Sequence, residues 1–211
     1  MDFINSASLF SFILTCALIE STPGPNMAYI AVLSATDGRR AGYAAIAGIA
    51  LGLLIVGLAA AMGVATLISN SPIAYQVLRF GGVLYLLWLA WDTWKPAPLL
   101  SASEVKSLIY NARFFKRGLI TNLLNPKAAL FYIAMLPKFI NPEQSTAAQA
   151  VFLTIVFVIV ATIIHGLIVT LAGSARPFLE NDRHRLIVRR ILALVLVGVA
   201  VWFGVSTGQK I

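Results

Sequence analysis

Charged side chains are scarce in this chain. Only 11% of its 211 residues are Asp, Glu, Lys or Arg, and 59% are hydrophobic. Soluble globular domains average about 25% charged and about 45–50% apolar residues. The composition therefore excludes a soluble globular protein and predicts an integral membrane protein. A net charge of +8 would suggest nucleic-acid binding in a soluble protein, but in a membrane chain the placement of the charges matters more. We expect no nucleic-acid partner.

Cysteine and histidine are almost absent. Cys16 is the only cysteine and there are two histidines, so a disulfide framework within the chain is excluded and a transition-metal site is poorly supplied. The metalloprotease, nucleophile-elbow, P-loop and dinucleotide motifs are missing. We therefore expect a protein that is not an enzyme and holds no metal or cofactor. Any active transport would use an ion gradient or another domain.

Long apolar segments dominate the rest of the sequence. A membrane-spanning helix needs roughly 20 mainly apolar residues, and six segments of this chain qualify. They predict an all-α polytopic membrane protein of one domain. The six segments are 7–36, 41–68, 72–94, 114–137, 148–173 and 191–207.

Basic residues in the connections predict how the spans are oriented. Twelve of the 16 Lys and Arg residues lie in or beside the connections between spans one and two, three and four, and five and six. By the positive-inside rule these connections are cytoplasmic, and both termini are periplasmic. Trp88, Trp91 and Trp94, followed by Lys95, form an interfacial anchor that agrees with this orientation.

Three spans precede a polar linker and three follow it, so the halves have opposite orientations. We expect one repeat over residues 1–95, a cytoplasmic linker over 96–112 and a second repeat over 113–211. Each half opens with a proline-interrupted helix, and paired interrupted helices indicate a binding site at the interface of inverted repeats. The alternative is two ordinary proline kinks in unrelated helices.

The first interruption contains Pro23, Gly24, Pro25 and Asn26, one turn after Glu20. Proline removes a backbone donor, and in hydrocarbon such a break survives only where protein or a water-filled cavity surrounds it. An acid at membrane depth is by default a functional candidate. Glu20 is either a neutral structural carboxylic acid or a proton carrier that can also meet a substrate amine.

The second interruption contains Asn122, Asn125, Pro126 and Lys127. Asn125 suits a helix N-cap with Pro126 at the first helical position; Ser21, Thr22 or Gly24 can act similarly in the first interruption. A half-helix N-terminus at mid-membrane is a site for an anion such as an amino-acid carboxylate. Together with Glu20 and the asparagines, these helix ends predict a receptor of the size of an amino-acid zwitterion.

Three further side chains keep two interpretations each. Lys127 either extends to an interface or faces the cavity and pairs with Glu20 or Asp37. Asp37 belongs to a solvated turn or to a cytoplasmic gate with a basic residue. His165 makes a structural interhelical hydrogen bond or relays protons.

Small residues also form a GxxxG pattern at Gly48 and Gly52. Such a pattern allows close helix approach, which predicts packing against a neighbour in the bundle or, less directly, dimerisation.

The chain contains a series of ordered motifs: STPGPN at 21–26, GRRAG at 38–42, GIALG at 48–52, GGVLYL at 81–86, FKRGLITNLLNPKA at 115–128 and LPKF at 136–139. Together these motifs resemble the LysE/RhtB family of amino-acid exporters. Order and spacing match over most of the chain, whereas the last two spans match in character only. The family's Pro-Gly-Pro and Asn-Pro-Lys motifs correspond to residues 23–25 and 125–127. The resemblance implies a bacterial inner-membrane exporter of amino acids or close derivatives, driven by the proton motive force.

We therefore expect a proton-coupled exporter of small amino acids or derivatives from cytoplasm to periplasm, located in the bacterial inner membrane. The alternative is a passive channel or facilitator for a small polar solute, which needs no titrating group. The expected partners are the amino-acid substrate and the lipid bilayer, with a homo-oligomer as a further option. The expected energy source is the proton gradient.

Overall fold

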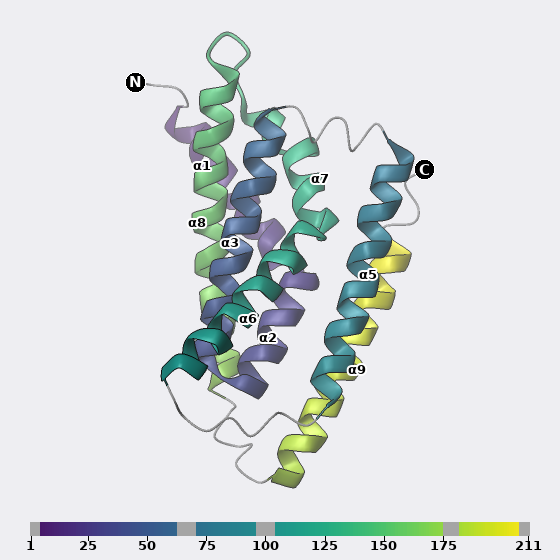
Figure 1. Ribbon diagram of the computed structural model, residues 1–211. Helices are drawn as coiled ribbons and strands as arrows, with labels where there is room; N and C mark the ends of the chain where they lie inside the picture. Colours follow the sequence, from purple (N-terminus) through teal and green to yellow (C-terminus); the bar gives the residue numbers. More distant parts are fainter. Residues whose placement is uncertain (1–4, 63–70, 96–103, 175–181, 207–211) are drawn as a thin grey trace.

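A computed structural model describes residues 5–62, 71–95, 104–174 and 182–206, and these residues are helical, without a strand among them. The predicted all-α class is confirmed (Figure 1). The helices are α1 (Ser6–Ser21), α2 (Pro25–Asp37), α3 (Arg39–Ala61), α5 (Pro72–Trp94), α6 (Glu104–Leu123), α7 (Pro126–Ala134), the short 3-10 helix η1 (Leu136–Phe139), α8 (Thr146–Gly173) and α9 (Asp182–Ser206).

Both predicted interruptions are sharp bends. The axes of α1 and α2 differ by 61°, and those of the helical segments on either side of the second break by 49°. Pro25 begins α2 and Pro126 begins α7, each directly after an N-cap residue, Gly24 and Asn125. Asn125 is thus confirmed as an N-cap, and Gly24 is the cap among the three candidates in the first break. Proline at this position loses no hydrogen bond, because the first N–H groups of a helix have no partner within it.

Helix α3 packs directly on α6. A Cβ atom at Gly48 would lie 2.0 Å from Phe115 O, and one at Gly118 would lie 2.1 Å from Ala45 O, so the two backbones touch. A Cβ at Gly52 would meet Asn122 Nδ2 at 2.8 Å. The GxxxG pattern therefore packs against a neighbour in the same chain, as predicted, and brings Asn122 to the centre of the bundle.

The two halves pack in a crossed manner. Helix α3 of the first half lies along α6 and α7 of the second, and α8 of the second half lies along α1 and α2 of the first. The remaining helices α5 and α9 pair with each other and stand at one edge of the bundle (Figure 1). Each half therefore buries the broken helix of the other half, which is the packing expected if the halves are related as inverted repeats.

Among the described residues, α3 and α8 are each long and apolar enough to cross a membrane, and each bent pair qualifies when counted as one span. Six spans arranged as inverted repeats stay a prediction.

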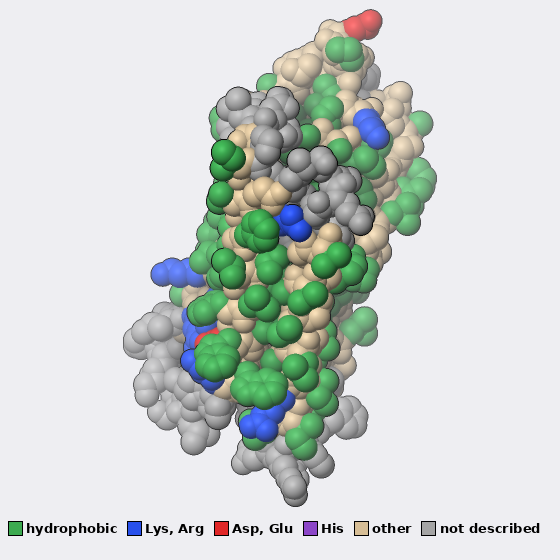
Figure 2. Space-filling model, turned by 90° about the vertical axis from the view of Figure 1, so that its right-hand side faces the viewer, with side chains coloured by type: hydrophobic (Ala, Val, Ile, Leu, Met, Phe, Trp, Pro, Cys, Tyr) green, Lys and Arg blue, Asp and Glu red, His purple; other side chains and the backbone are tan. Residues whose placement is uncertain are grey.

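The outward surface is strongly apolar. Exposed large side chains on α5 recur every three or four residues, at Ile73, Val77, Phe80, Leu84 and Trp88. Figure 2 shows the face formed by α5 and α9, where apolar side chains cover most of the surface and basic side chains gather mainly toward its lower end. Such helical stripes fit contact with lipid.

Three predicted bounds differ from the helices. Helix α6 begins at Glu104, inside the expected linker 96–112, and α9 begins at Asp182, ahead of the expected span start at 191. Hydropathy locates the apolar part of a helix, whereas the helix itself continues into polar residues. Helix α3 ends at Ala61, and the rest of the predicted span to 68 lies mostly outside the described residues. The chain ends 1–4 and 207–211 and the linker residues 96–103 also lie outside them.

The contact between α3 and α6 predicts the effect of one added methyl group. Gly48→Ala places a Cβ against backbone atoms of α6, and overpacking of this kind costs roughly 1–3 kcal/mol of stability. Gly198→Ala in α9 meets nothing within 4 Å and serves as the control. Thermal unfolding of the detergent-solubilised variants should show a lower midpoint for Gly48→Ala only. Equal midpoints would contradict the direct backbone contact.

Candidate functional site

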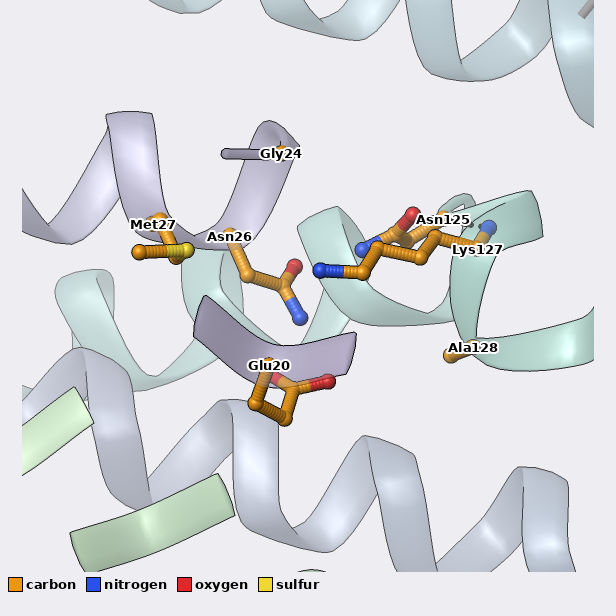
Figure 3. Close-up of a pocket in the computed structure, with 7 residues that line it drawn as sticks. All are labelled: Glu20, Gly24, Asn26, Met27, Asn125, Lys127 and Ala128. Carbon is orange, nitrogen blue, oxygen red and sulfur yellow. Dashed lines mark hydrogen bonds between the residues drawn. The ribbon is translucent and has the colours of Figure 1, made fainter. Parts of the chain in front are cut away.

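The two breaks meet in one pocket. The first break contributes Glu20, Gly24, Asn26 and Met27, and the second contributes Asn125, Lys127 and Ala128 (Figure 3). The space between them is about 10 Å³, which is room for about one water molecule. The structure thus brings together the acid, the lysine and two of the asparagines that the sequence indicated.

Two hydrogen bonds run in opposite directions between the breaks. Asn26 Nδ2 donates to Asn122 Oδ1 at 2.8 Å, and both side chains are buried. Lys127 Nζ donates to Thr22 O at 2.9 Å, a carbonyl in the interrupted stretch of the first half. The second half therefore supplies an acceptor and a donor to the polar groups at the first break.

Lys127 faces the pocket and does not extend away from it. Its side chain runs from α7 toward Asn26 and the first break (Figure 3). Of the two partners considered for its ammonium group, Glu20 lines the same pocket, but the hydrogen bond goes to Thr22 O. Asp37 is not the partner, because its own contacts are with other residues of the described chain.

The beginnings of α2 and α7 both face this pocket. Gly24 and Asn125 are the N-caps, and Asn125 Oδ1 accepts a hydrogen bond from Lys127 N at 3.0 Å. Pro25 is buried at the start of α2, and Pro126 starts α7. Pro23 lies in the extended stretch between α1 and α2 and does not line the pocket. Two helix N-termini, each with a positive dipole end, therefore point to one place.

Glu20 contacts a histidine that the sequence had not linked to it. Glu20 Oε2 lies 3.2 Å from His165 Nε2, at ion-pair distance but without the alignment of a good hydrogen bond. Glu20 is 6% exposed and His165 is 1% exposed. The two residues are far apart in the chain, and the only signal was that each shares a helix face with small residues. His165 thus has an interhelical partner, and that partner is the candidate proton carrier.

Some polar atoms at the site are buried without a partner among the described residues. They include Asn26 Oδ1 and Asn122 Nδ2, the two amide atoms that do not take part in the hydrogen bond between these side chains. Buried polar groups are nearly always hydrogen-bonded in folded proteins. Asn26 lines the pocket, so its Oδ1 is an acceptor there, whereas Asn122 Nδ2 lies against Gly52 of α3.

Asp37 belongs to a second polar cluster at the far end of α2, rather than to a solvated turn. Its carboxylate accepts hydrogen bonds from Thr36 Oγ1 at 2.6 Å and Tyr110 Oη at 3.2 Å. Arg189 of α9 lies 3.7 Å from it and donates to Thr93 O of α5. A basic partner for Asp37 was anticipated; its identity, Arg189, was not.

Asp92 of α5 forms a neighbouring ionic contact with α6. Its carboxylate lies 3.0 Å from Arg113 and 2.7 Å from Arg117, and the Arg117 guanidinium also lies over the Trp88 ring. The Asp92 contacts join α5 to α6, and the Arg189–Asp37 contact joins α9 to α2. They lie at the end of the molecule where α2 joins α3 (Figure 1).

The buried amide pair predicts a measurable coupling. Asn26→Ala and Asn122→Ala each remove the same hydrogen bond, so their costs should be non-additive by roughly 0.5–1.5 kcal/mol. Asn26→Ala with Gln149→Ala, whose bonds are to Asn141, is the control pair and should be additive. Unfolding of all single and double variants measures both cycles. Additivity in the first cycle would mean that the amides do not hold the breaks together.

The chain was compared with known proteins. It is 34% identical over 174 residues to the homoserine/homoserine lactone efflux protein of Salmonella typhi, covering 82% of this chain and 84% of that protein. It is 30% identical over 198 residues to the leucine efflux protein of Klebsiella pneumoniae, covering 90% of this chain and 91% of that protein. No solved structure matches the chain.

A family model also matches most of the sequence. The model described as LysE type translocator covers residues 17–207, which include both breaks and every pocket residue. The chain therefore belongs to the LysE type translocator family.

Proposed function

We propose that this protein is a proton-coupled exporter of small amino acids or their derivatives, moving them from the cytoplasm to the periplasm across the bacterial inner membrane. The observation that supports the proposal most directly is the pocket at the two helix breaks. One acid, one lysine and two helix N-termini meet at this pocket.

In this proposal the pocket binds a zwitterion by its two charged ends. The ammonium group meets the Glu20 carboxylate. The carboxylate meets Lys127 and the N-terminal amides of α2 and α7, where the helix dipoles favour an anion. Asn26 and Asn122 supply the neutral hydrogen-bonding groups, one donor and one acceptor of which are unpaired among the described residues.

The substrate side chain is expected to be small and uncharged. Beyond the charged and amide groups, the pocket is lined by Met27, Ala128 and Gly24, which offer apolar contact and no further charge. The related proteins named above are efflux proteins for homoserine, its lactone or leucine. We propose substrates of this class for the present chain.

The cluster at Asp37 acts as a cytoplasmic gate in this proposal. Asp37, Arg189 and Asp92 join α2, α5, α6 and α9 at the end that carries the basic connections, which the positive-inside rule assigns to the cytoplasm. Opening this end requires these contacts to break, so that the substrate can reach the pocket. Rocking of the two halves around a fixed mid-membrane site would then expose the pocket alternately to each side.

The first test concerns Glu20. In inverted vesicles with an acidic interior, an exporter that exchanges one proton per substrate should accumulate homoserine or leucine about tenfold per pH unit of gradient. Glu20→Gln should insert normally but show no gradient-driven accumulation. Glu143→Gln, which changes an exposed acid outside the pocket, is the matched control. Accumulation by Glu20→Gln at the wild-type level would refute the role of Glu20. Equilibration independent of the gradient in the wild type would favour a facilitator.

The second test concerns Lys127. If its ammonium group binds the substrate carboxylate, Lys127→Gln should raise the KM for homoserine by about 10- to 100-fold, because hydrogen bonds to charged groups contribute roughly 1.5–3 kcal/mol. Transport of homoserine lactone, which has no free carboxylate, should change much less. Lys138→Gln, at an exposed lysine of η1, is the control. An equal rise for both compounds would show that Lys127 does not recognise the carboxylate.

A further inference from the structure

A buried pair of ionisable groups connects the two halves beside the pocket. Glu20 comes from α1 and His165 from α8, and 3.2 Å separates Oε2 from Nε2. Glu20 also lines the pocket, whereas His165 does not line it and is 1% exposed. The Glu20 side chain therefore contacts both the histidine and the pocket.

We infer that His165 and Glu20 form one proton-carrying pair, in which the proton on His165 and the ammonium group of the substrate compete for the Glu20 carboxylate. This inference rests on the proposed export of amino acids and adds a residue and a coupling rule to it. His165 is a positioning residue here, because it acts on the substrate through Glu20.

The argument follows from the charge of the pair. With Glu20 ionised and His165 protonated, the pair is neutral and the carboxylate has its counter-ion. When the proton leaves, the pair carries one negative charge, and a buried charge without a partner is strongly unfavourable. A substrate ammonium entering from the pocket supplies the missing cation. Either the proton or the ammonium group can stabilise the carboxylate, and binding of one weakens binding of the other.

The exchange is a simple proton transfer. Substrate binding breaks the N–H bond of the His165 imidazolium, and the proton passes to water on the side to which the pocket is open. The substrate ammonium keeps its protons and forms an ion pair with Glu20. On the opposite face of the membrane the reverse exchange releases the substrate. This competition produces antiport of one proton against one substrate.

Other ionisable groups near the pair do not replace this role. Helix α1 adds the Cys16 thiol, and α7 adds Lys127 and the Tyr132 hydroxyl. Lys127 Nζ and Tyr132 Oη donate to carbonyls, those of Thr22 and Leu53. The other elements packed against α1 and α8 add further ionisable groups. They are Tyr29 and Asp37 of α2, Arg39, Arg40 and Tyr43 of α3, and the exposed Lys138 of η1. Asp37, Arg39, Arg40 and Tyr43 lie near the gate end. His165 is the group within ion-pair distance of Glu20.

The inference predicts proton release on substrate binding. Purified wild-type protein in weakly buffered detergent solution should release about one proton per homoserine or leucine bound, measured with a pH-sensitive dye. Where a proton occupies the pair before binding, each unit by which the pH falls should raise the apparent Kd about tenfold. If substrate binds but releases no proton at every pH tested between about 5 and about 8, the inference is overturned.

Variants in proteoliposomes separate coupling from transport. With His165→Gln, exchange of labelled homoserine should lose its dependence on pH and gradient-driven accumulation should disappear. His184→Gln changes the other histidine of the chain, near the start of α9, and should match the wild type. A purely structural His165 would instead lower exchange at every pH by one factor and leave the pH profile in place, which would refute the inference.

These results also separate the inference from the proposed function. Exchange by the wild type without proton release or pH dependence would refute the pair and leave amino-acid transport standing. Absence of any exchange by the wild type with both amino acids would refute the proposed function and the inference together. Proton release by the wild type is measured without any variant, so the test does not depend on whether His165→Gln folds.

Discussion

The structure depends on hydrogen bonds by which each of two broken helices pairs polar groups of the other. A helix interrupted in hydrocarbon exposes backbone groups that lipid cannot hydrogen-bond. Here Lys127 of the second break donates to the carbonyl of Thr22 in the first, and Asn26 of the first donates to Asn122 next to the second. Neither break would be stable against lipid alone. Each is stable because the other lies beside it, and the same arrangement creates a polar pocket.

The crossed packing of the halves places the breaks together. Backbone contact between α3 and α6 at Gly48 and Gly118 sets the position of Asn122, and α8 brings His165 to Glu20. Larger residues at the contact would separate the helices and move the amide pair apart. The aromatic cluster of Phe12, Phe131 and Phe157 joins α1, α7 and α8 beside this region. Packing of small and aromatic residues thus holds the polar site in place.

Polar groups occur at two levels along the bundle. One level, at the start of α2, is the pocket with Glu20 and Lys127. The other, at the end of α2, is the ionic cluster with Asp37, Arg189 and Asp92. Apolar side chains of α2 such as Ile30 and Leu33 are buried between them. In a transporter this separation lets one set of contacts bind the substrate while the other opens and closes a route to it. The two levels share α2, so a movement of α2 can link them.

The membrane character, the helical class, the two breaks and most of the residues that line the pocket could be predicted from the sequence, because apolar runs and prolines act locally. It indicated Gly48 and Gly52 as a contact surface but not which helix they meet. The contacts of His165 with Glu20, of Lys127 with Thr22 and of Arg189 with Asp37 could not be predicted and appear only in the packed bundle. These partners are distant in the chain, and their pairing depends on how whole helices cross. Periodicity within one helix shows which face is buried, whereas the neighbour on that face is set by the packing of the other helices.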